Sequence, residues 1–297
     1  MIKIEQLYKS YKYHQVLKGL DMNVKKGEVY GFIGENGAGK TTTMNIICNI
    51  IPKDSGVVTL NDGNPAKIGY LPENPMLYNY MTANEYLSYI GACCKYKGNI
   101  KERNAELLKL VGLEAAAKRK IKGYSRGMNQ RLGLASIIYN DPDIIVLDEP
   151  TSALDPQGRA DVMNLLSYLK GEGKTIILST HILTDVERVA DTIGILVGGK
   201  IVLEDSLKNL LSENKDIAVI TPLVRSEEIH NSIMSIDFAN VSFTKSGNYE
   251  IALNDTVNGN EKLQKYLSEN NVILANYHIK KDSLESIYMK AVNGNAN

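Results

Sequence analysis

The 297-residue sequence has no tryptophan, few cysteines and no excess of charge of either sign. The three cysteines are Cys48 and the adjacent pair Cys93 and Cys94, and this odd number argues against a disulfide framework. Their spacing does not fit a Cys/His metal site either, so a reduced, cytoplasmic setting is expected. Basic and acidic residues number 34 each, so no strongly basic surface points to nucleic acid as a partner.

Long apolar runs are also missing. No stretch approaches the roughly 20 apolar residues that span a bilayer. The N-terminal segment 1–7 alternates apolar and polar residues as a strand does, and lacks the basic start and apolar centre of a signal peptide. We therefore expect that any link to a membrane runs through a partner protein.

What the chain does have is a glycine-rich segment at residues 34–42, GENGAGKTT, which fits the phosphate-loop pattern G-x-x-x-x-G-K-T. An apolar run at 29–33 predicts a buried strand before it, and residues 41–47 predict a helix after it. Backbone N–H groups and the helix N-terminus would then bind phosphate oxygens, with the lysine on the β- and γ-phosphates and the first threonine on Mg²⁺. The candidate nucleotide-binding residues are Gly34, Asn36, Gly37, Gly39, Lys40, Thr41 and Thr42.

Two further candidates flank this segment. Tyr11 lies between two predicted antiparallel strands, 1–7 and 20–24, where an aromatic ring can stack on adenine; Tyr13 is its competitor. Glu73 stands where a predicted strand, 67–71, gives way to a Pro-rich loop, and can face a metal ion there.

The pattern between residues 76 and 140 is helical. A capping box at 82–85 opens one predicted helix, and apolar spacing predicts another over 101–111. Ser125 is a predicted N-cap for a third helix, and Gly127 allows close backbone approach, so this helix start is a second possible phosphate site. The residues predict a helical insert of about 65 residues within an α/β core.

Two acidic residues follow the buried strand predicted at 143–147. Asp148 can orient Mg²⁺ and Glu149 can polarise an attacking water if this strand tip lies beside the phosphate loop. His181 ends another predicted core strand, 175–181, and can hydrogen-bond a γ-phosphate or hold the water.

In this order the motifs resemble those of one family, the ATP-binding subunits of ABC transporters, from the N-terminus to about Leu203. The resemblance implies catalysis by Glu149, His181 and Lys40, and Mg²⁺ held by Thr41, Glu73 and Asp148. It implies that ATP contacts Tyr11, the phosphate loop and, from a second subunit, the signature motif at Ser125 and Gly127. Residues 152–155, with Asp155, resemble the loop that contacts the second subunit.

The same resemblance implies the partners. Two subunits, as a homodimer or a heterodimer, would close on two ATP molecules and drive a separate membrane permease, most simply an exporter. The protein would then lie at the inner face of the cell membrane, with no nucleic acid involved. Two positions depart from the family pattern, because Glu73 replaces the usual glutamine and Arg126 replaces a signature glycine.

The sequence therefore predicts an α/β P-loop NTPase core with an antiparallel β subdomain and an α-helical insert (about 74–140) in residues 1–204. Residues 205–297 show the order β-α-β-β-α-β, which predicts a small ferredoxin-like α+β domain for dimerisation, regulation or packing. A soluble ABC-type ATPase acting on ribosomes or nucleic acid is the alternative, opposed by the single cassette and the lack of heptads. A non-enzymatic ATP-gated clamp is opposed by the presence of both Glu149 and His181.

Overall fold

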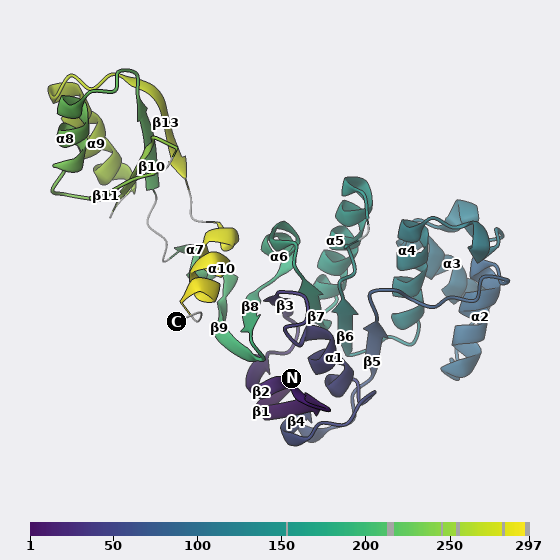
Figure 1. Cartoon of the computed structure of the whole chain (residues 1–297). Helices are drawn as coiled ribbons and strands as arrows, with labels where there is room; N and C mark the ends of the chain where they lie inside the picture. The colour runs from purple at the N-terminus through teal and green to yellow at the C-terminus, as the bar shows by residue number, and fades with distance from the viewer. Residues whose placement is uncertain (153, 213–216, 245, 254–255, 281–282, 295–297) are drawn as a thin grey trace. The chain divides into compact units, whose positions relative to one another are not determined.

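The computed structural model describes residues 1–152, 154–212, 217–244, 246–253, 256–280 and 283–294. It contains two compact units (Figure 1). The first consists of Met1–Leu207 with Ala291–Asn297, and the second of Lys208–Lys290. Because buried residues form separate clusters in the two units, each unit has a hydrophobic core of its own.

A six-stranded sheet in the order β5-β6-β7-β3-β8-β9 forms the centre of the first unit. The first five of these strands run parallel, and β9 pairs antiparallel with β8. Their bounds are β3 Val29–Gly34, β5 Ile68–Leu71, β6 Ile144–Asp148, β7 Thr175–Thr180, β8 Thr192–Val197 and β9 Lys200–Ser206. The carboxyl ends of β3, β6 and β7 therefore meet at one edge, where the polar residues that follow them gather.

The two faces of this sheet bury different layers, since successive side chains of a strand point to opposite faces. On β6, Ile144 and Val146 belong to a core shared with helix α1 (Lys40–Ile47), whereas Ile145 and Leu147 belong to a core shared with the other helices. The first core also holds β1 (Ile2–Tyr11) of a three-stranded antiparallel sheet, β2-β1-β4, completed by β2 (His14–Val24) and β4 (Ser55–Leu60).

Three helices gather beside the β5 edge of the sheet (Figure 1): α2 (Ala83–Cys93), α3 (Ile100–Leu110) and α4 (Arg126–Ile137). The predicted capping box of α2 is confirmed, because Thr82 accepts from the Glu85 N–H and Glu85 accepts from the Thr82 N–H. The core is completed by α5 (Pro156–Gly171) and α6 (Leu183–Val189). No helix among the described residues is long and apolar enough to cross a bilayer.

The second unit contains a four-stranded antiparallel sheet in the order β11-β12-β10-β13, with helices α8 and α9. Its elements follow the order β-α-β-β-α-β of ferredoxin-like domains. The bounds are β10 Ile217–Pro222, α8 Glu227–Met234, β11 Asn240–Phe243, β12 Tyr249–Ala252, α9 Thr256–Glu269 and β13 Leu274–Lys280, flanked by α7 Leu207–Ser212 and α10 Leu284–Asn293. Ile220, Ile251 and Leu263 are fully buried in this core.

Candidate functional site

The glycine-rich segment forms the turn between β3 and α1. Gly39 takes φ +114° as the N-cap of α1, and a Cβ there would come within 2.7 Å of Leu17. Only glycine tolerates both the backbone angle and the contact. The Lys40 ammonium donates to the carbonyl oxygens of Gly34 at 2.6 Å and Glu35 at 3.2 Å, so the lysine folds back along the loop that precedes it.

Asp148, at the end of β6, contacts the start of α1. Its Oδ2 accepts from the Thr41 hydroxyl at 2.6 Å, and its Oδ1 accepts from the Ser179 hydroxyl at 2.6 Å. Ser179 is the neighbour of Asp148 in the parallel register of β6 and β7, which is why the two side chains meet. Burial, and next the negative charge of Asp148, raise the pKa of Tyr70 to about 12.

Glu149 is buried in a strained conformation beside Lys40. Its φ of +46° lies in the left-handed region, which costs a non-glycine residue roughly 1–3 kcal/mol and is typical of functional sites. The Glu149 N–H donates to the Ser179 hydroxyl at 3.0 Å, and Oε2 lies 2.9 Å from His181 Nδ1. Oε1 lies 3.6 Å from the Lys40 ammonium and finds no hydrogen-bond partner among the described residues.

A cavity of about 380 Å³ joins these groups. Its floor is the phosphate loop, and Glu73, Asp148 and Glu149 line its wall. The full lining is His14, Val16, Glu35, Asn36, Gly37, Gly39, Lys40, Thr41, Thr42, Glu73, Asp148 and Glu149. The structure thus brings together most of the nucleotide and metal candidates that the sequence indicates.

Tyr11 does not line this cavity. It ends β1, is 47% exposed, and lies with its ring 5.5 Å from the Lys9 ammonium. Its partner across the hairpin is His14, which does line the cavity. Tyr13 is fully exposed, so neither tyrosine ring is packed against the phosphate loop.

Ser125, Gly127 and Asp155 lie around a different cavity, of about 400 Å³, which shares no lining residue with the first. Ser125 is the N-cap of α4 and accepts from the Met128 N–H at 3.2 Å, as the sequence predicts. Asp155 is the N-cap of α5 and accepts from the Gly158 N–H at 2.9 Å. Of the loop expected to contact a second subunit, Ala153 lies outside the described residues.

Arg126, which replaces a glycine of the family pattern, contacts the loop after β5. Its guanidinium donates to Asn74 Oδ1 at 3.2 Å, and Asn74 directly follows Glu73. Within one chain, this hydrogen bond therefore joins the start of α4 to the loop that carries Glu73.

Sequence reasoning missed several residues that the structure places at these sites. Ser179 contacts both acidic residues, but only the pairing of β6 with β7 reveals this, because its local sequence is that of an ordinary strand. His14 lines the first cavity because the β1–β2 hairpin turns toward the phosphate loop. Arg131 and Asp161 line the second cavity, on helices where their spacing gives no local signal.

The residues around Asp148 fit a magnesium ion. Mg²⁺ prefers hard oxygen ligands and is usually held by one or two protein groups together with substrate phosphates and waters. Thr41 and Asp148 supply a hydroxyl and a carboxylate oxygen 2.6 Å apart, next to the phosphate loop. Glu73 adds a second carboxylate on the wall of the same cavity.

A parallel sheet in which β3 leads into a glycine-rich loop and a helix N-terminus, while β6, separated from β3 by β7, ends at the acidic residues, defines a P-loop nucleoside triphosphatase. Residues 17–152 match the family model described as "ABC transporter". The chain belongs to the ATP-binding proteins of ABC transporters, and it is therefore an ATPase.

Individual comparisons agree with this family. The chain is 33% identical to the uncharacterized ABC transporter ATP-binding protein YxlF of Bacillus subtilis, over 98% of this chain and 99% of that protein. It is 30% identical to the bacitracin transport ATP-binding protein BcrA of Enterococcus faecalis, over 99% of this chain and 97% of that protein. A solved dimer of the ATP-binding cassette MJ0796 in a post-hydrolysis state, bound to ADP and Pi, matches with a TM-score of 0.64 and 29% identity, over 70% of this chain and 99% of that chain.

Proposed function

We propose that the protein powers an exporter by closing, head to tail, with a second ATP-binding subunit on two ATP molecules. The observation that carries this proposal is the separation of the two cavities within one chain. One cavity is lined by the phosphate loop and by Glu73, Asp148 and Glu149. The other is lined by the N-termini of α4 and α5, and the two cavities share no lining residue. A second subunit would bring its α4 and α5 ends to the phosphate loop of the first.

In this proposal each residue has a stated role. The loop N–H groups and Lys40 bind the phosphates, and Thr41 with Asp148 holds Mg²⁺, which neutralises charge on the phosphate oxygens when it is bound. Glu149 accepts a proton from the attacking water, since Glu149 lines the phosphate-loop cavity and its Oε1 accepts no hydrogen bond among the described residues, and His181 fixes the carboxylate through Oε2. Ser125, Gly127 and Asp155 act on the ATP of the second subunit.

The transport role is proposed from the family and from the named relatives. ABC ATPase cassettes dimerise and work with membrane permeases, and a relative similar over nearly the whole chain is named for bacitracin transport. We propose a separate permease, a location at the inner membrane face, and export of the substrate. Testing the direction needs inside-out vesicles that contain the permease: ATP-dependent uptake into them supports export, and efflux refutes it.

The ATP-dependent closure is tested with Glu149→Gln. This variant should bind ATP with unchanged affinity, lose turnover and accumulate as a dimer with ATP in sedimentation velocity. Turnover at the wild-type rate would refute the assignment of Glu149 as the base, and a monomer in saturating ATP would refute closure.

A further inference from the structure

Helices α3 and α4 satisfy each other's C-terminal carbonyl groups through two arginines. Arg131 of α4 donates to the carbonyls of Val111 at 3.1 Å and Gly112 at 3.5 Å, just past the end of α3. Arg103 of α3 donates to the carbonyls just past the end of α4, those of Ile138 at 2.9 Å and Tyr139 at 3.1 Å. Both contacts use a cation where a helix leaves carbonyls unpaired.

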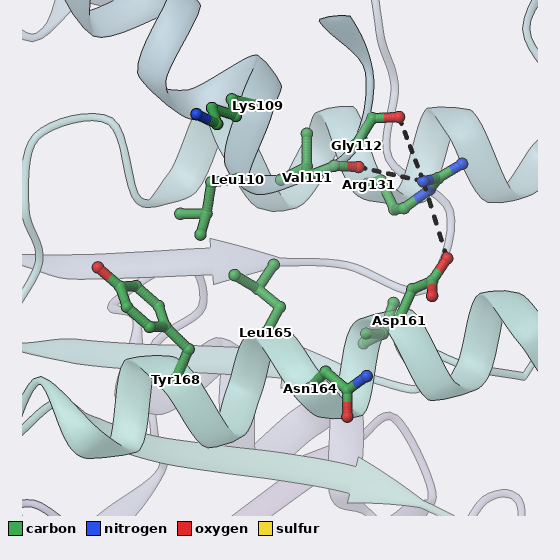
Figure 2. A pocket seen from close by; sticks show the side chains of 10 residues that line it. Lys109, Leu110, Val111, Gly112, Arg131, Asp161, Asn164, Leu165 and Tyr168 are labelled. Carbon is green, nitrogen blue, oxygen red and sulfur yellow. Dashed lines mark hydrogen bonds and ion pairs between the residues drawn. The ribbon is translucent and has the colours of Figure 1, made fainter.

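Only one arginine of this pair also reaches α5. Arg131 Nη1 lies 3.9 Å from Asp161 Oδ2, and Figure 2 shows the guanidinium between the end of α3 and this carboxylate. Arg103 instead pairs with Glu106 of its own helix at 2.8 Å. Arg131 therefore joins three helices, whereas Arg103 joins two.

The Arg131–Asp161 pair lies at the same depth on both helices that border the Ser125 cavity. Arg131 is six residues beyond the N-cap Ser125, and Asp161 is six residues beyond the N-cap Asp155. At a rise of 1.5 Å per residue, the pair lies about 9 Å along each helix from its cap. Because the Arg131–Asp161 contact lies equally far from the two N-caps, it constrains both the distance between the N-termini of α4 and α5 and their shift along the helix axes.

The same two side chains form a wall between two hollows. They line the Ser125 cavity, and they also line a cavity of about 430 Å³ between α3, α4 and α5. Arg131 and Asp161 are thus shared by the linings of both cavities. Asp161 is itself held by the Gln157 amide, which donates at 2.9 Å from the first turn of α5.

We propose that Arg131 is a positioning residue that, through Asp161, sets the spacing of Ser125 and Asp155 so that both engage the ATP of a second subunit. This inference rests on the proposed head-to-tail closure. It adds the contact that positions the helix ends at Ser125 and Asp155, which would bind the ATP of the second subunit. Arg131 Nη1 makes all three contacts, and a lysine should weaken them because its ammonium, on a shorter side chain, does not reach the position of Nη1.

The test measures dimer formation by sedimentation velocity across a range of ATP concentrations, with Glu149→Gln as the parent. Asp161→Asn removes the charge on α5 but leaves the contacts between Arg131 and the end of α3 intact. Arg131→Lys weakens the contacts with α3 and the contact with Asp161 of α5. Arg103→Lys is the matched control, because it weakens the reciprocal contact between α3 and α4 without touching α5. Binding of a fluorescent ATP analogue to the monomer and the melting temperature are measured for each.

We expect Asp161→Asn and Arg131→Lys to raise the ATP concentration for half-maximal dimer formation roughly two- to fivefold, the effect of losing one partly exposed ion pair. Monomer nucleotide affinity should not change, since the phosphate loop is separate. Arg103→Lys should lower the melting temperature about as much as Arg131→Lys but leave dimer formation at the parent value.

Three results would overturn the inference. If Asp161→Asn dimerises at the same ATP concentration as the parent, dimer formation does not depend on the contact with α5. If Arg103→Lys shifts the ATP concentration for half-maximal dimer formation as much as the other variants, the effect comes from helix stability alone. If the parent itself stays monomeric with ATP, the proposed closure fails and this inference fails with it. If the parent dimerises and the Asp161 variant matches it, only this inference fails.

Discussion

Replacing Ser179 by alanine should damage the site and the fold together. Its hydroxyl donates to buried Asp148 at 2.6 Å and accepts from the Glu149 N–H at 3.0 Å. A hydrogen bond to a charged group contributes about 1.5–3 kcal/mol and a neutral one about 1 kcal/mol. Ser179→Ala should therefore lower the free energy of unfolding by about 2.5–4 kcal/mol.

The same change should slow hydrolysis, because Asp148 loses the group that orients it and Glu149 loses a contact that holds its strained backbone. We propose that Asp148 holds Mg²⁺, and removing an outer contact of a metal ligand typically costs about 10–100-fold in activity or metal affinity. Urea denaturation measures the stability change, and a coupled assay at saturating Mg²⁺ and ATP measures kcat.

Ser167→Ala is the matched control. The Ser167 hydroxyl donates at 3.0 Å to the Met163 carbonyl of its own helix, away from the site. We expect its stability to change by less than about 0.5 kcal/mol and its kcat to stay at the wild-type value. If Ser179→Ala behaves like this control in both assays, the reasoning that Ser179 supports the two acidic residues is refuted.

Three further outcomes are expected. Glu73→Gln should keep substantial ATPase activity, because an amide oxygen can also accept from water; total loss of turnover would show that the carboxylate is required. Tyr11→Ala should weaken ATP binding about three- to tenfold in equilibrium titration, and Tyr13→Ala should not; the reverse pattern would assign stacking to Tyr13. Burial raises the pKa of Cys48 to about 12, so at pH 8 its thiol stays protonated and unreactive. Mass spectrometry after brief alkylation should find exposed Cys93 modified before Cys48, and the opposite order would contradict that burial.

Much of the catalytic core could be predicted from local sequence, because the phosphate loop and the strand tips are short segments with their own patterns. The predicted strand before residues 34–42 and the helix after them are confirmed as β3 and α1. The strands predicted at 143–147 and 175–181 are confirmed as β6 and β7. In the second unit the predicted β-α-β-β-α-β order agrees with the elements observed.

Contacts between elements could not be predicted in this way. Ser179 meets Asp148 only because β7 pairs beside β6, and a strand sequence does not state its neighbour. Arg131 meets the end of α3 and Asp161 only through the packing of three helices. Tyr11 differs in the opposite way: its place in the sequence predicts stacking on adenine, but in the single chain it does not line the phosphate-loop cavity.

The central claim is that each ATP is bound by the phosphate loop of one subunit and the Ser125 cavity of another. Mixing two inactive variants tests it most directly: Lys40→Ala lacks the phosphate-binding lysine, and Ser125→Arg blocks the receiving cavity. In a mixed dimer, Lys40 of one chain faces Ser125 of the other, so one complete site is restored. We predict that ATPase activity returns when the two inactive variants are mixed. A mixture as inactive as each variant alone would contradict the account.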